Sequence, residues 1–590
     1  MMHVVDTPAK IRAAFGARIL GRLGRRHAVT LRDRTFQGGA REEPGAAAVP
    51  FDPGGWRSQS VVRGETGSCD LPNSVAPILM AAEPPGRGTA GLPSLPSDTP
   101  TAPAGEELVE TRRIFPNTAY RAAADVGSKV VSIAFFVVMA RKLGEAAFGT
   151  FTFGLAFAAL VTVLAGFGQD IVLIREVARD RSRLHYYFTN TFLLKLLLAA
   201  PVIGLGTLLT ALGGMESATR TVVLLLGFAI LAELLASTCF AVYQAFERME
   251  FIPIVIISQR VITAAAGIAA MTLGGGVVTV SATYLAGSLA ALVLAVALLF
   301  RYVARPELRA DPGAWWPLMR SAIPVGIALV LQVVLFRVDT AILQLLKSAR
   351  VVGAYGAAYR LFESTLFVSW AVTVAAYPVF ARLTMRTEPS IRSVFERSLK
   401  LVLAMTVPAG VGAFVVAKPL VRVLYGSEFD RSVLPLQLLS AAVILYGVTA
   451  VTSGMLLAQD RQRAIAIVYA ALTAANVAAN FASIPRWSLN AAALITSATE
   501  LASAAALLWL AYRVVGSLDW RRVLLGPLLA GAAAAVVMIL LRPHLAAAIG
   551  AGLIIYASTL AGFEHLVYPQ DAGAVMSFLR RRGTVARTPT

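Results

Sequence analysis

The sequence predicts an all-α, polytopic membrane protein with about fourteen transmembrane helices. Three observations predict this fold class. The 590-residue chain is 57% hydrophobic and only 15% charged, and its mean hydropathy is +0.68. The apolar residues recur in blocks of about twenty, the length at which a helix crosses the hydrocarbon core of a bilayer. A soluble protein could not bury so much apolar surface, so these blocks are expected to lie in a membrane.

Residues 1–113 come first and form a basic, Pro- and Gly-rich cytoplasmic tail, which lacks apolar periodicity and is predicted to be disordered. Within it, residues 10–26 could form a basic amphipathic helix that lies on anionic lipid. A solvated tail, or a gene start placed too far upstream, is the alternative. The basic residues are not followed by the apolar stretch of a secretory signal peptide, so cleavage is not expected.

The transmembrane spans follow from Thr118 onward and are assigned by hydropathy and length. Residues 114–304 hold the first six spans as an N-terminal six-helix lobe, and residues 305–515 hold the next six as a C-terminal six-helix lobe. The two lobes are expected to surround a central cavity. Residues 516–566 add two transmembrane helices, and residues 567–590 form a cytoplasmic C-terminal tail. The spans are centred near residues 131, 158, 197, 231, 264, 291, 329, 369, 403, 445, 471, 501, 536 and 554.

The charges in the loops predict the orientation. Loops after even-numbered spans are rich in arginine, whereas loops after odd-numbered spans are shorter and poorer in cations. The positive-inside rule therefore places the even loops and both termini in the cytoplasm, and we expect the bacterial cytoplasmic membrane as the location. We interpret the net charge of +19 as a topological signal and expect no nucleic-acid partner. The arginines after spans two and six are Arg175, Arg179, Arg181, Arg183, Arg301, Arg305, Arg309 and Arg320.

Neither cysteine nor histidine chemistry is expected to hold the protein together. Cys69 and Cys239 could form no framework of bridges, and the five histidines include no pair at metal-ligand spacing. No cofactor or metal is therefore expected. No loop after Thr118 is long enough to fold as a catalytic domain, so the sequence favours a transporter over a membrane enzyme.

One short pattern occurs twice, at positions that are six predicted spans apart. Phe148-Gly149-Thr150-Phe151 opens span two and Val352-Gly353-Ala354-Tyr355 opens span eight, and each has an aromatic residue two positions after a glycine. A repeat of six spans in the same order would relate the two lobes by an axis along the membrane normal. The alternative is that glycine and aromatic residues are common at any helix start near the membrane interface.

Four longer stretches resemble one family. FRVDTAILQLLKSARVVGAYGAAYRLFESTLF (336–367) is similar to the span seven to eight signature of polysaccharide-exporting flippases, and GFGQDIVLIREVARDR (166–181) is similar to the end of their span two. KPLVRVLYGSEF (418–429) and LLAQDRQR (456–463) resemble the segments after their spans nine and ten. Residues 117–512 are thus identified as similar to Wzx-type flippases of the multidrug/oligosaccharidyl-lipid/polysaccharide exporter superfamily.

The resemblance implies a transporter that moves an undecaprenyl-pyrophosphate-linked oligosaccharide from the cytoplasmic to the outer leaflet by alternating access, for cell-surface polysaccharide biosynthesis. The implied partners are this polyprenyl-pyrophosphate-linked glycan, membrane lipids, a coupling ion and the polysaccharide polymerase machinery. Two alternatives stay open. One is a cation-coupled exporter of small drugs with the same architecture, and the other, less favoured, is a membrane glycosyltransferase.

Four charged residues of spans seven and eight are predicted to form a cluster. Arg337 and Asp339 lie two positions apart, so on a regular helix they point about 200° away from each other and cannot pair. Counted from the outer ends of their helices, these two lie roughly 10 to 14 Å deep, and Arg360 and Glu363 lie roughly 13 to 18 Å deep. We therefore predict that Asp339 pairs with Arg360 and Arg337 with Glu363. The cluster could staple the helices, rearrange as a gate, or contact the substrate.

Further polar residues in the predicted spans are candidates for the cavity. Lys195 and Arg260 lie about nine residues inside the cytoplasmic ends of spans three and five, where they could capture a lipid pyrophosphate. Snorkelling or structural pairing is the alternative. Glu233 and Glu500 fall near mid-membrane, and each could either bind a coupling ion or form hydrogen bonds between helices. Hydroxyls beside Glu500 could bind sugar hydroxyls; they belong to Thr496, Ser497 and Thr499.

Overall fold

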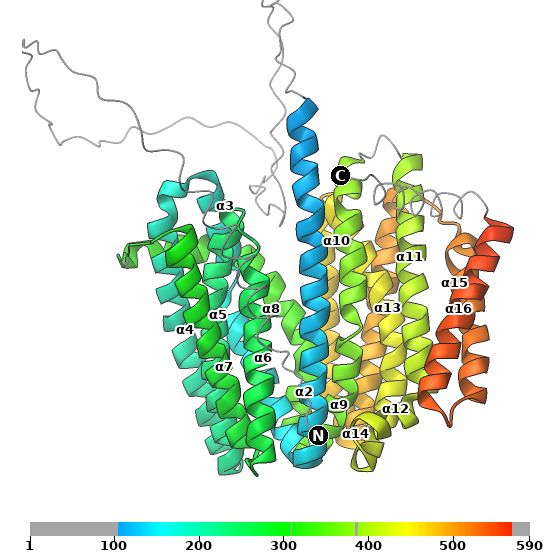
Figure 1. Ribbon diagram of the computed structural model, residues 1–590, viewed down its shortest axis with the longest axis horizontal. Helices are drawn as coiled ribbons and strands as arrows, with labels where there is room; N and C mark the ends of the chain where they lie inside the picture. Colours follow the sequence, from blue (N-terminus) through cyan, green and yellow to red (C-terminus); the bar gives the residue numbers. More distant parts are fainter. Residues whose placement is uncertain (1–103, 308, 384–387, 569–590) are drawn as a thin grey trace, which may run out of the picture. The chain divides into compact units, whose positions relative to one another are not determined.

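The computed structural model describes residues 104–307, 309–383 and 388–568. In that part of the chain the elements are α-helices with short 3-10 and π segments, and no strand occurs, which confirms the all-α polytopic fold class (Figure 1). Several predictions concern residues 1–103 and 569–590 and lie outside the described residues. They are the disordered tail, its amphipathic helix and nearly all of the C-terminal tail.

The first described helix starts earlier than the sequence predicts. It begins at Ala104, inside the predicted tail, because the segment EELVETRR consists mostly of strong helix formers. The α-helices, in chain order, are α2 Ala104–Gly166, α3 Gln169–Arg179, α4 Leu184–Leu212, α5 Ser217–Ala245, α6 Phe251–Thr272, α7 Val277–Leu298, α8 Trp315–Leu346, α9 Ala349–Glu363, α10 Leu366–Arg382, α11 Glu388–Val415, α12 Ala417–Leu424, α13 Val433–Ala458, α14 Gln462–Val515, α15 Trp520–Leu540 and α16 Leu545–Val567. Short segments join some of them: η1 Arg181–Arg183, η2 Leu299–Val303, η3 Pro312–Ala314 and η5 Ser427–Ser432.

Local side-chain and backbone chemistry ends these helices. After α6, Gly274 takes the left-handed conformation with φ 86°, and the Gly275 N–H donates to the Ala270 carbonyl at 2.8 Å, which satisfies a carbonyl in the last turn. After α3, the Asp180 carboxylate accepts hydrogen bonds from the hydroxyl and the backbone N–H of Ser182. These bonds favour the charged carboxylate and lower the pKa of Asp180.

Helix α14 is longer than a bilayer is thick and folds back on itself. Its 54 residues would extend about 80 Å as one straight helix. The Asn476 Nδ2 atom nevertheless donates to Thr499 Oγ1 at 2.9 Å, although 23 positions separate the two residues. The reversal lies at Ser488, where φ is 55° and the backbone is not helical. Two antiparallel segments therefore make up α14.

Helix α2 reverses in the same way. Gly144 has φ 77°, a conformation that glycine adopts without a steric penalty. The rings of Phe135 and Phe151, which lie on opposite sides of this glycine in the sequence, are 6.3 Å apart. A straight helix would separate residues 16 positions apart by about 24 Å. The two segments of α2 therefore also run antiparallel.

The described chain contains 12 helices that are long and apolar enough to cross a membrane. Two of them, Gly127–Gly166 and Gln462–Val515, contain the reversals at Gly144 and Ser488. Dividing both at the reversal gives the fourteen spans expected from hydropathy. The multi-pass character is thus confirmed, and the exact count of fourteen stays a prediction.

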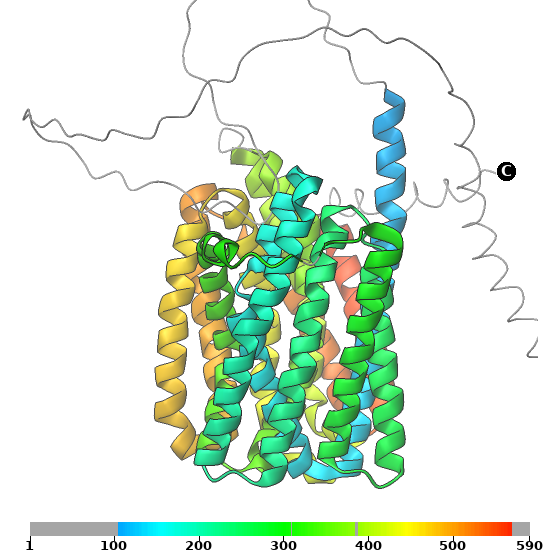
Figure 2. The same cartoon turned by 90° about the vertical axis from the view of Figure 1, so that its left-hand side faces the viewer.

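The helices divide into two groups. In the first, α5 packs on α2, α4 and α7, and α6 packs on α2 and α7. In the second, α13 packs on α10, α11 and α14, and the α15–α16 hairpin packs on α11. The spanning helices run alongside one another in both views (Figures 1 and 2).

Segment η2 ends at Val303 and α14 ends at Val515, close to the lobe boundaries predicted at 304 and 515. The domain division itself stays a prediction.

Helix α8 contacts both groups. Leu318 and Ala322 in its first turns pack with Val172 of α3. Farther along, the Leu331 carbonyl accepts a hydrogen bond from Thr473 of α14 at 3.5 Å. Because one continuous helix packs on both groups, α8 is one of the elements that link the two lobes.

Candidate functional site

A cluster of three charged side chains lies where α8 and α9 face each other. Glu363 Oε1 is 2.6 Å from Arg337 Nη2, and Glu363 Oε2 is 3.0 Å from Arg360 Nη1. The three side chains are only 20 to 24% exposed. One carboxylate therefore serves two guanidinium groups, and this trio, which we call the arginine cluster, keeps a net positive charge.

The predicted pair between Arg337 and Glu363 is confirmed, but the predicted pair between Asp339 and Arg360 is wrong. Arg360 lies three positions before Glu363 on the same face of α9, so the nearest carboxylate belongs to its own helix. Its guanidinium also lies 4.3 Å above the centre of the Phe136 ring. Asp339 is 2% exposed and takes neutral donors instead. These are the Tyr355 hydroxyl and, at 2.6 Å, the Thr340 backbone N–H.

A small cavity of about 70 Å³ adjoins the arginine cluster. Its wall combines cations from both lobes, since Lys129 belongs to α2 and Arg360 to α9. A second cavity of about 340 Å³ is lined almost entirely by apolar side chains of α9, α11, α13, α15 and α16. Leu361 and Ser364 line both cavities, so the cationic cavity and the apolar cavity meet at the end of α9. Sequence reasoning missed Lys129, which lies among polar and small residues at the start of an apolar block.

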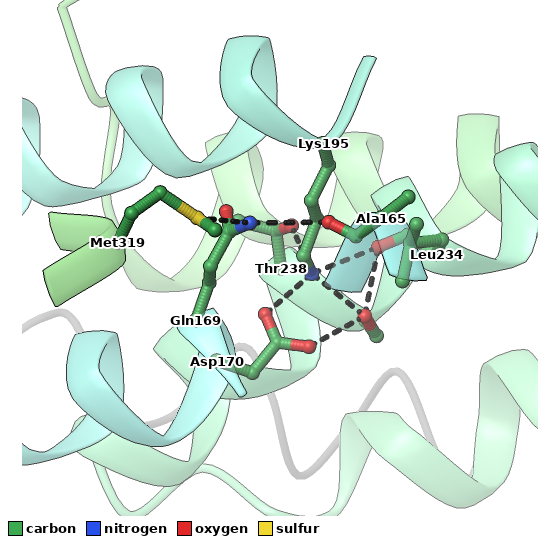
Figure 3. Close-up of polar contacts among 8 residues, drawn as sticks. Ala165, Gln169, Asp170, Lys195, Leu234, Thr238 and Met319 are labelled. Carbon is green, nitrogen blue, oxygen red and sulfur yellow. Dashed lines mark hydrogen bonds and ion pairs between the residues drawn. The ribbon is translucent and has the colours of Figure 1, made fainter. Parts of the chain in front are cut away.

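Lys195 of α4 is completely buried, and polar atoms of two other helices, α3 and α5, surround its ammonium group (Figure 3). The Nζ atom lies 2.5 Å from Asp170 Oδ1 and donates to Thr238 Oγ1 at 2.9 Å and to the Leu234 carbonyl at 3.0 Å. Ser237 Oγ is a further contact of Nζ at 3.0 Å and donates to the other oxygen of Asp170. In this arrangement Lys195 has no surface for a substrate, so its predicted substrate contact would require the cluster to open.

Arg260 and Glu233 lie near each other in the first lobe without forming an ion pair. Glu233 Oε1 accepts hydrogen bonds from the Gln259 amide and, at 3.1 Å, from the Ser288 hydroxyl. Arg260 Nη1 donates to the Tyr284 hydroxyl at 3.3 Å. The structure therefore brings these two predicted residues into one polar group on α5, α6 and α7, and it keeps Lys195 in a separate one.

Glu500 lies in the second lobe, on α14. It is 5% exposed, and its Oε2 atom has no hydrogen-bond partner among the described residues. Of the predicted hydroxyls beside Glu500, that of Thr496 contacts Asp339 Oδ2 at 3.4 Å. Ser497 instead donates to the Leu438 carbonyl, and Thr499 accepts from Asn476. Within the described part of the chain, no group of three or more His, Cys, Asp and Glu side chains could hold a metal ion.

The two copies of the repeated pattern touch each other. A Cβ atom on Gly149 would collide with the Ala349 carbonyl and lie 2.7 Å from the Gly353 nitrogen. A Cβ atom on Gly353 would collide with the Glu145 carbonyl and lie 3.1 Å from the Gly149 nitrogen. The backbones of α2 and α9 are thus in direct contact, which only glycine permits. We call this the glycine contact.

Side chains next to the glycine contact also join the lobes. The Glu145 backbone N–H donates to Glu428 Oε1 at 3.1 Å, and Arg141 Nε donates to the Leu424 carbonyl at 2.7 Å. The Phe148 ring packs edge-on against the Phe429 ring at 5.8 Å. These contacts close the lobe interface at the end where α2 reverses, which is the face predicted to be extracytoplasmic.

Comparisons with known proteins agree with this geometry. The sequence matches the family model for polysaccharide biosynthesis proteins over residues 114–384 and the MatE family model over residues 324–482. A search of curated proteins gives no match. The chain is similar to the structure of lipid II flippase MurJ in an inward closed conformation, with a TM-score of 0.64, 14% identity and coverage of 75% of this chain and 98% of that one.

A second similar structure is the inward-facing conformation of a multidrug resistance MATE family transporter of the MOP superfamily. Its TM-score is 0.52, its identity is 14%, and the match covers 66% of this chain and 94% of that one. At such identities the structural likeness shows a shared fold. At family level these matches point to a multi-pass membrane transporter. More narrowly, they confirm the resemblance to the polysaccharide flippases of the multidrug/oligosaccharidyl-lipid/polysaccharide exporter superfamily.

Proposed function

We infer that the chain is a flippase for an undecaprenyl-pyrophosphate-linked oligosaccharide, which it moves to the outer leaflet of a bacterial cytoplasmic membrane for cell-surface polysaccharide biosynthesis. The meeting of the cationic cavity with the apolar cavity at the end of α9 carries this proposal. A prenyl diphosphate needs both environments, because desolvated phosphate oxygens require charged donors and the prenyl chain requires apolar surface. The polysaccharide polymerase machinery would then be a partner on the far side of the membrane.

The charge balance around the cationic cavity supports a diphosphate. Glu363 neutralises only one of the two arginines in the arginine cluster, and Lys129 adds a further positive charge at the cavity wall. A diphosphate diester that enters between Lys129 and Arg360 would balance the positive charge that the protein leaves uncompensated. A small cationic drug would instead meet like charges there, which is unfavourable.

A cation-coupled drug exporter is the second candidate, and Glu500 is the observation that favours it. Its buried oxygen without a hydrogen-bond partner and the buried Asp339 network put two carboxyl groups in the second lobe. Buried carboxyl groups inside a membrane are typical of ion and proton pathways. A flippase and a drug exporter could both use these acids for ion coupling. The two candidate functions therefore differ only in the transported substrate.

The test uses the full chain in proteoliposomes. A polyprenyl-pyrophosphate oligosaccharide with a fluorophore on its glycan is incorporated, and a membrane-impermeant reductant reports how fast the probe exchanges between leaflets. We expect the protein to accelerate exchange, and Arg360→Gln to slow it by about tenfold or more, because a hydrogen-bonded charge contact to the diphosphate is lost.

The matched control is Arg422→Gln, since Arg422 is paired with Asp430 on the exposed surface. Exposed pairs contribute little, so this variant should stay within about twofold of the wild type. The amount of folded protein is checked for each variant by gel filtration. Export of ethidium driven by a cation gradient, together with no acceleration of the lipid probe, would refute the flippase and establish the drug exporter.

A further inference from the structure

A short segment between α11 and α13 supplies several of the contacts that close the lobe interface. It consists of α12 and η5, and we call residues 417–432 the gate segment. The Leu424 carbonyl accepts a hydrogen bond from Arg141, and Glu428 accepts one from the backbone of the first lobe. At the end of the segment, the Ser432 hydroxyl donates to a carbonyl of α9 at 2.7 Å. The gate segment is therefore fixed to the second lobe and reaches across to the first.

Tyr425 of the gate segment is buried, and its hydroxyl has no hydrogen-bond partner among the residues that the structure describes. The side chain is only 3% exposed. Its ring packs on Phe148 of the first lobe at 6.2 Å and on Phe429 at 5.5 Å. The residue also lines the cationic cavity, together with Lys129 and Arg360. A buried hydroxyl without a partner is costly, so a ligand in the cavity that offers an acceptor would be favoured.

The hydroxyl of Tyr425 is suited to donate to an anion. Burial raises the pKa of Tyr425, and the positive charge of Arg360 opposes this shift without cancelling it. The phenol therefore keeps its proton at neutral pH. Hydrogen bonds from O–H donors to charged oxygens are short and strong, and phosphate offers several such oxygens. Arg360 and the Tyr425 hydroxyl could thus bind the same diphosphate from two sides of the cavity.

The cationic cavity is too small to hold the head of a lipid-linked substrate unless one wall moves. Its volume is about 70 Å³, whereas ligand pockets usually measure about 300 to 1,000 Å³. Lys129 and Arg360 lie on α2 and α9, whose backbones touch at the glycine contact. Tyr425 lies on a short segment that individual side chains hold against the first lobe. The gate segment is therefore the wall that can move at the least cost.

We propose that Tyr425 couples substrate binding to opening of the lobe interface, because its hydroxyl donates to the diphosphate and the gate segment then moves away from the first lobe. This inference rests on the proposed flippase function and names the residue through which the substrate opens the closed end. A ligand shifts a conformational equilibrium only if it binds one state better than the other. The hydroxyl of Tyr425 supplies this difference, since it reaches the diphosphate fully once its ring has left Phe148.

The experiment measures opening with and without substrate in proteoliposomes. A single cysteine at Thr152, near Gly356 at the lobe interface, reports opening through its rate of reaction with a water-soluble thiol reagent. The native cysteines are replaced by Cys69→Ser and Cys239→Ala. We expect the polyprenyl-pyrophosphate oligosaccharide probe to accelerate labelling about tenfold, as one charge-assisted hydrogen bond allows. A probe with the same prenyl chain and glycan but no phosphate should not accelerate it.

Tyr425→Phe keeps the aromatic packing and removes only the hydroxyl. It should abolish the acceleration by the diphosphate probe and slow exchange of that probe about tenfold, while the labelling rate without the probe stays unchanged. Tyr556→Phe on α16 is the matched control. Tyr556 is 5% exposed, its hydroxyl also lacks a partner among the described residues, and it lines neither the cationic nor the apolar cavity. This control should keep the full acceleration.

A second variant tests the gate segment without changing Tyr425. Arg141→Gln removes the contact to the Leu424 carbonyl and should raise the labelling rate in the absence of any probe. Unchanged labelling in Arg141→Gln, full acceleration in Tyr425→Phe, or acceleration by the phosphate-free probe would overturn the inference and leave the flippase intact. Faster labelling of Tyr425→Phe without a probe would show a structural role for the hydroxyl and also overturn it. Failure of the wild type to exchange the diphosphate probe would overturn the flippase and this inference together.

Discussion

At the scale of single residues, Glu363 determines the charge balance of the arginine cluster, because it is the one carboxylate that contacts both Arg337 and Arg360 in the described structure. The pair with Arg337 could be predicted from helix periodicity and depth alone. The partner of Asp339 could not, since a tyrosine hydroxyl satisfies it without any charge. Counting only opposite charges overlooks phenol and backbone donors, which are equally able to satisfy a buried carboxyl group.

Double-mutant cycles on purified protein in detergent test these pairings. Glu363→Gln leaves two partly buried arginines without an acid and should cost about 3 to 5 kcal/mol of stability. Adding Arg337→Gln should recover part of this loss, with a coupling of about 0.5 to 3 kcal/mol. Asp339→Asn and Arg360→Gln should instead be additive within about 0.5 kcal/mol, because they do not touch. Thermal unfolding gives these values, and strong coupling between Asp339 and Arg360 would contradict the assigned contacts.

At the scale of helices, the glycine contact explains why the same short pattern occurs twice. The repeat could be seen in the sequence as a similarity between the starts of two spans. The contact between the two copies could not be predicted, because a sequence repeat does not indicate whether its copies lie next to each other. The structure supplies the reason: a helix on each lobe needs a glycine where the two backbones touch.

Gly149→Ala should weaken the closed lobe interface at that end. The added methyl group collides with the Ala349 carbonyl, which is rigid backbone, so α2 and α9 must separate. A cysteine at Thr152, which is 7% exposed and packs near Gly356, reports the separation. We expect a water-soluble thiol reagent to label it about tenfold faster in the Gly149→Ala background, equivalent to a shift of about 1.4 kcal/mol toward the open interface.

The control for this experiment is Gly204→Ala in α4. No atom lies within 4 Å of the added Cβ there, so the labelling rate of the cysteine at Thr152 should not change. Gly353→Ala should act like Gly149→Ala, because it inserts a methyl group at the same contact from the other lobe. Unchanged labelling in both variants, with normal amounts of folded protein, would show that this contact does not keep the interface closed.

The helix reversals also belong to the scale of helices, and hydropathy alone could not predict how they are made. Hydropathy places two spans within α14 and two within α2, but it predicts no turn of a single residue between them. Ser488 and Gly144 make these turns through left-handed backbone conformations, and only Gly144 could have been suspected from its residue type. A non-glycine residue at positive φ gives no signal in a single sequence.

At the scale of the whole molecule, orientation depends on charges that lie outside the helices. Cationic side chains are concentrated after even-numbered spans, as in Arg175 of α3, Arg183 of η1 and Arg309 beyond η2. The opposite end holds the glycine contact and the reversals of α2 and α14. Under the predicted orientation, the interface is closed toward the outside. Under the proposed function, a lipid-linked substrate made in the cytoplasm would then enter from the arginine-rich side.

Cysteine labelling in whole cells tests this orientation. In a background with Cys69→Ser and Cys239→Ala, single cysteines are placed at Arg309, Arg392 and Ser427. The first two follow spans six and eight, where the positive-inside rule predicts cytoplasm, and Ser427 lies in the segment after α12 at the end that carries the glycine contact. All three side chains are at least partly exposed, so a membrane and not burial decides which of them an impermeant thiol reagent reaches. We expect labelling at position 427 alone, and labelling at all three after the cells are permeabilised. Labelling at 309 with protection at 427 would invert the protein, turn its closed interface toward the cytoplasm, and require the cationic cavity to receive its substrate from outside the cell.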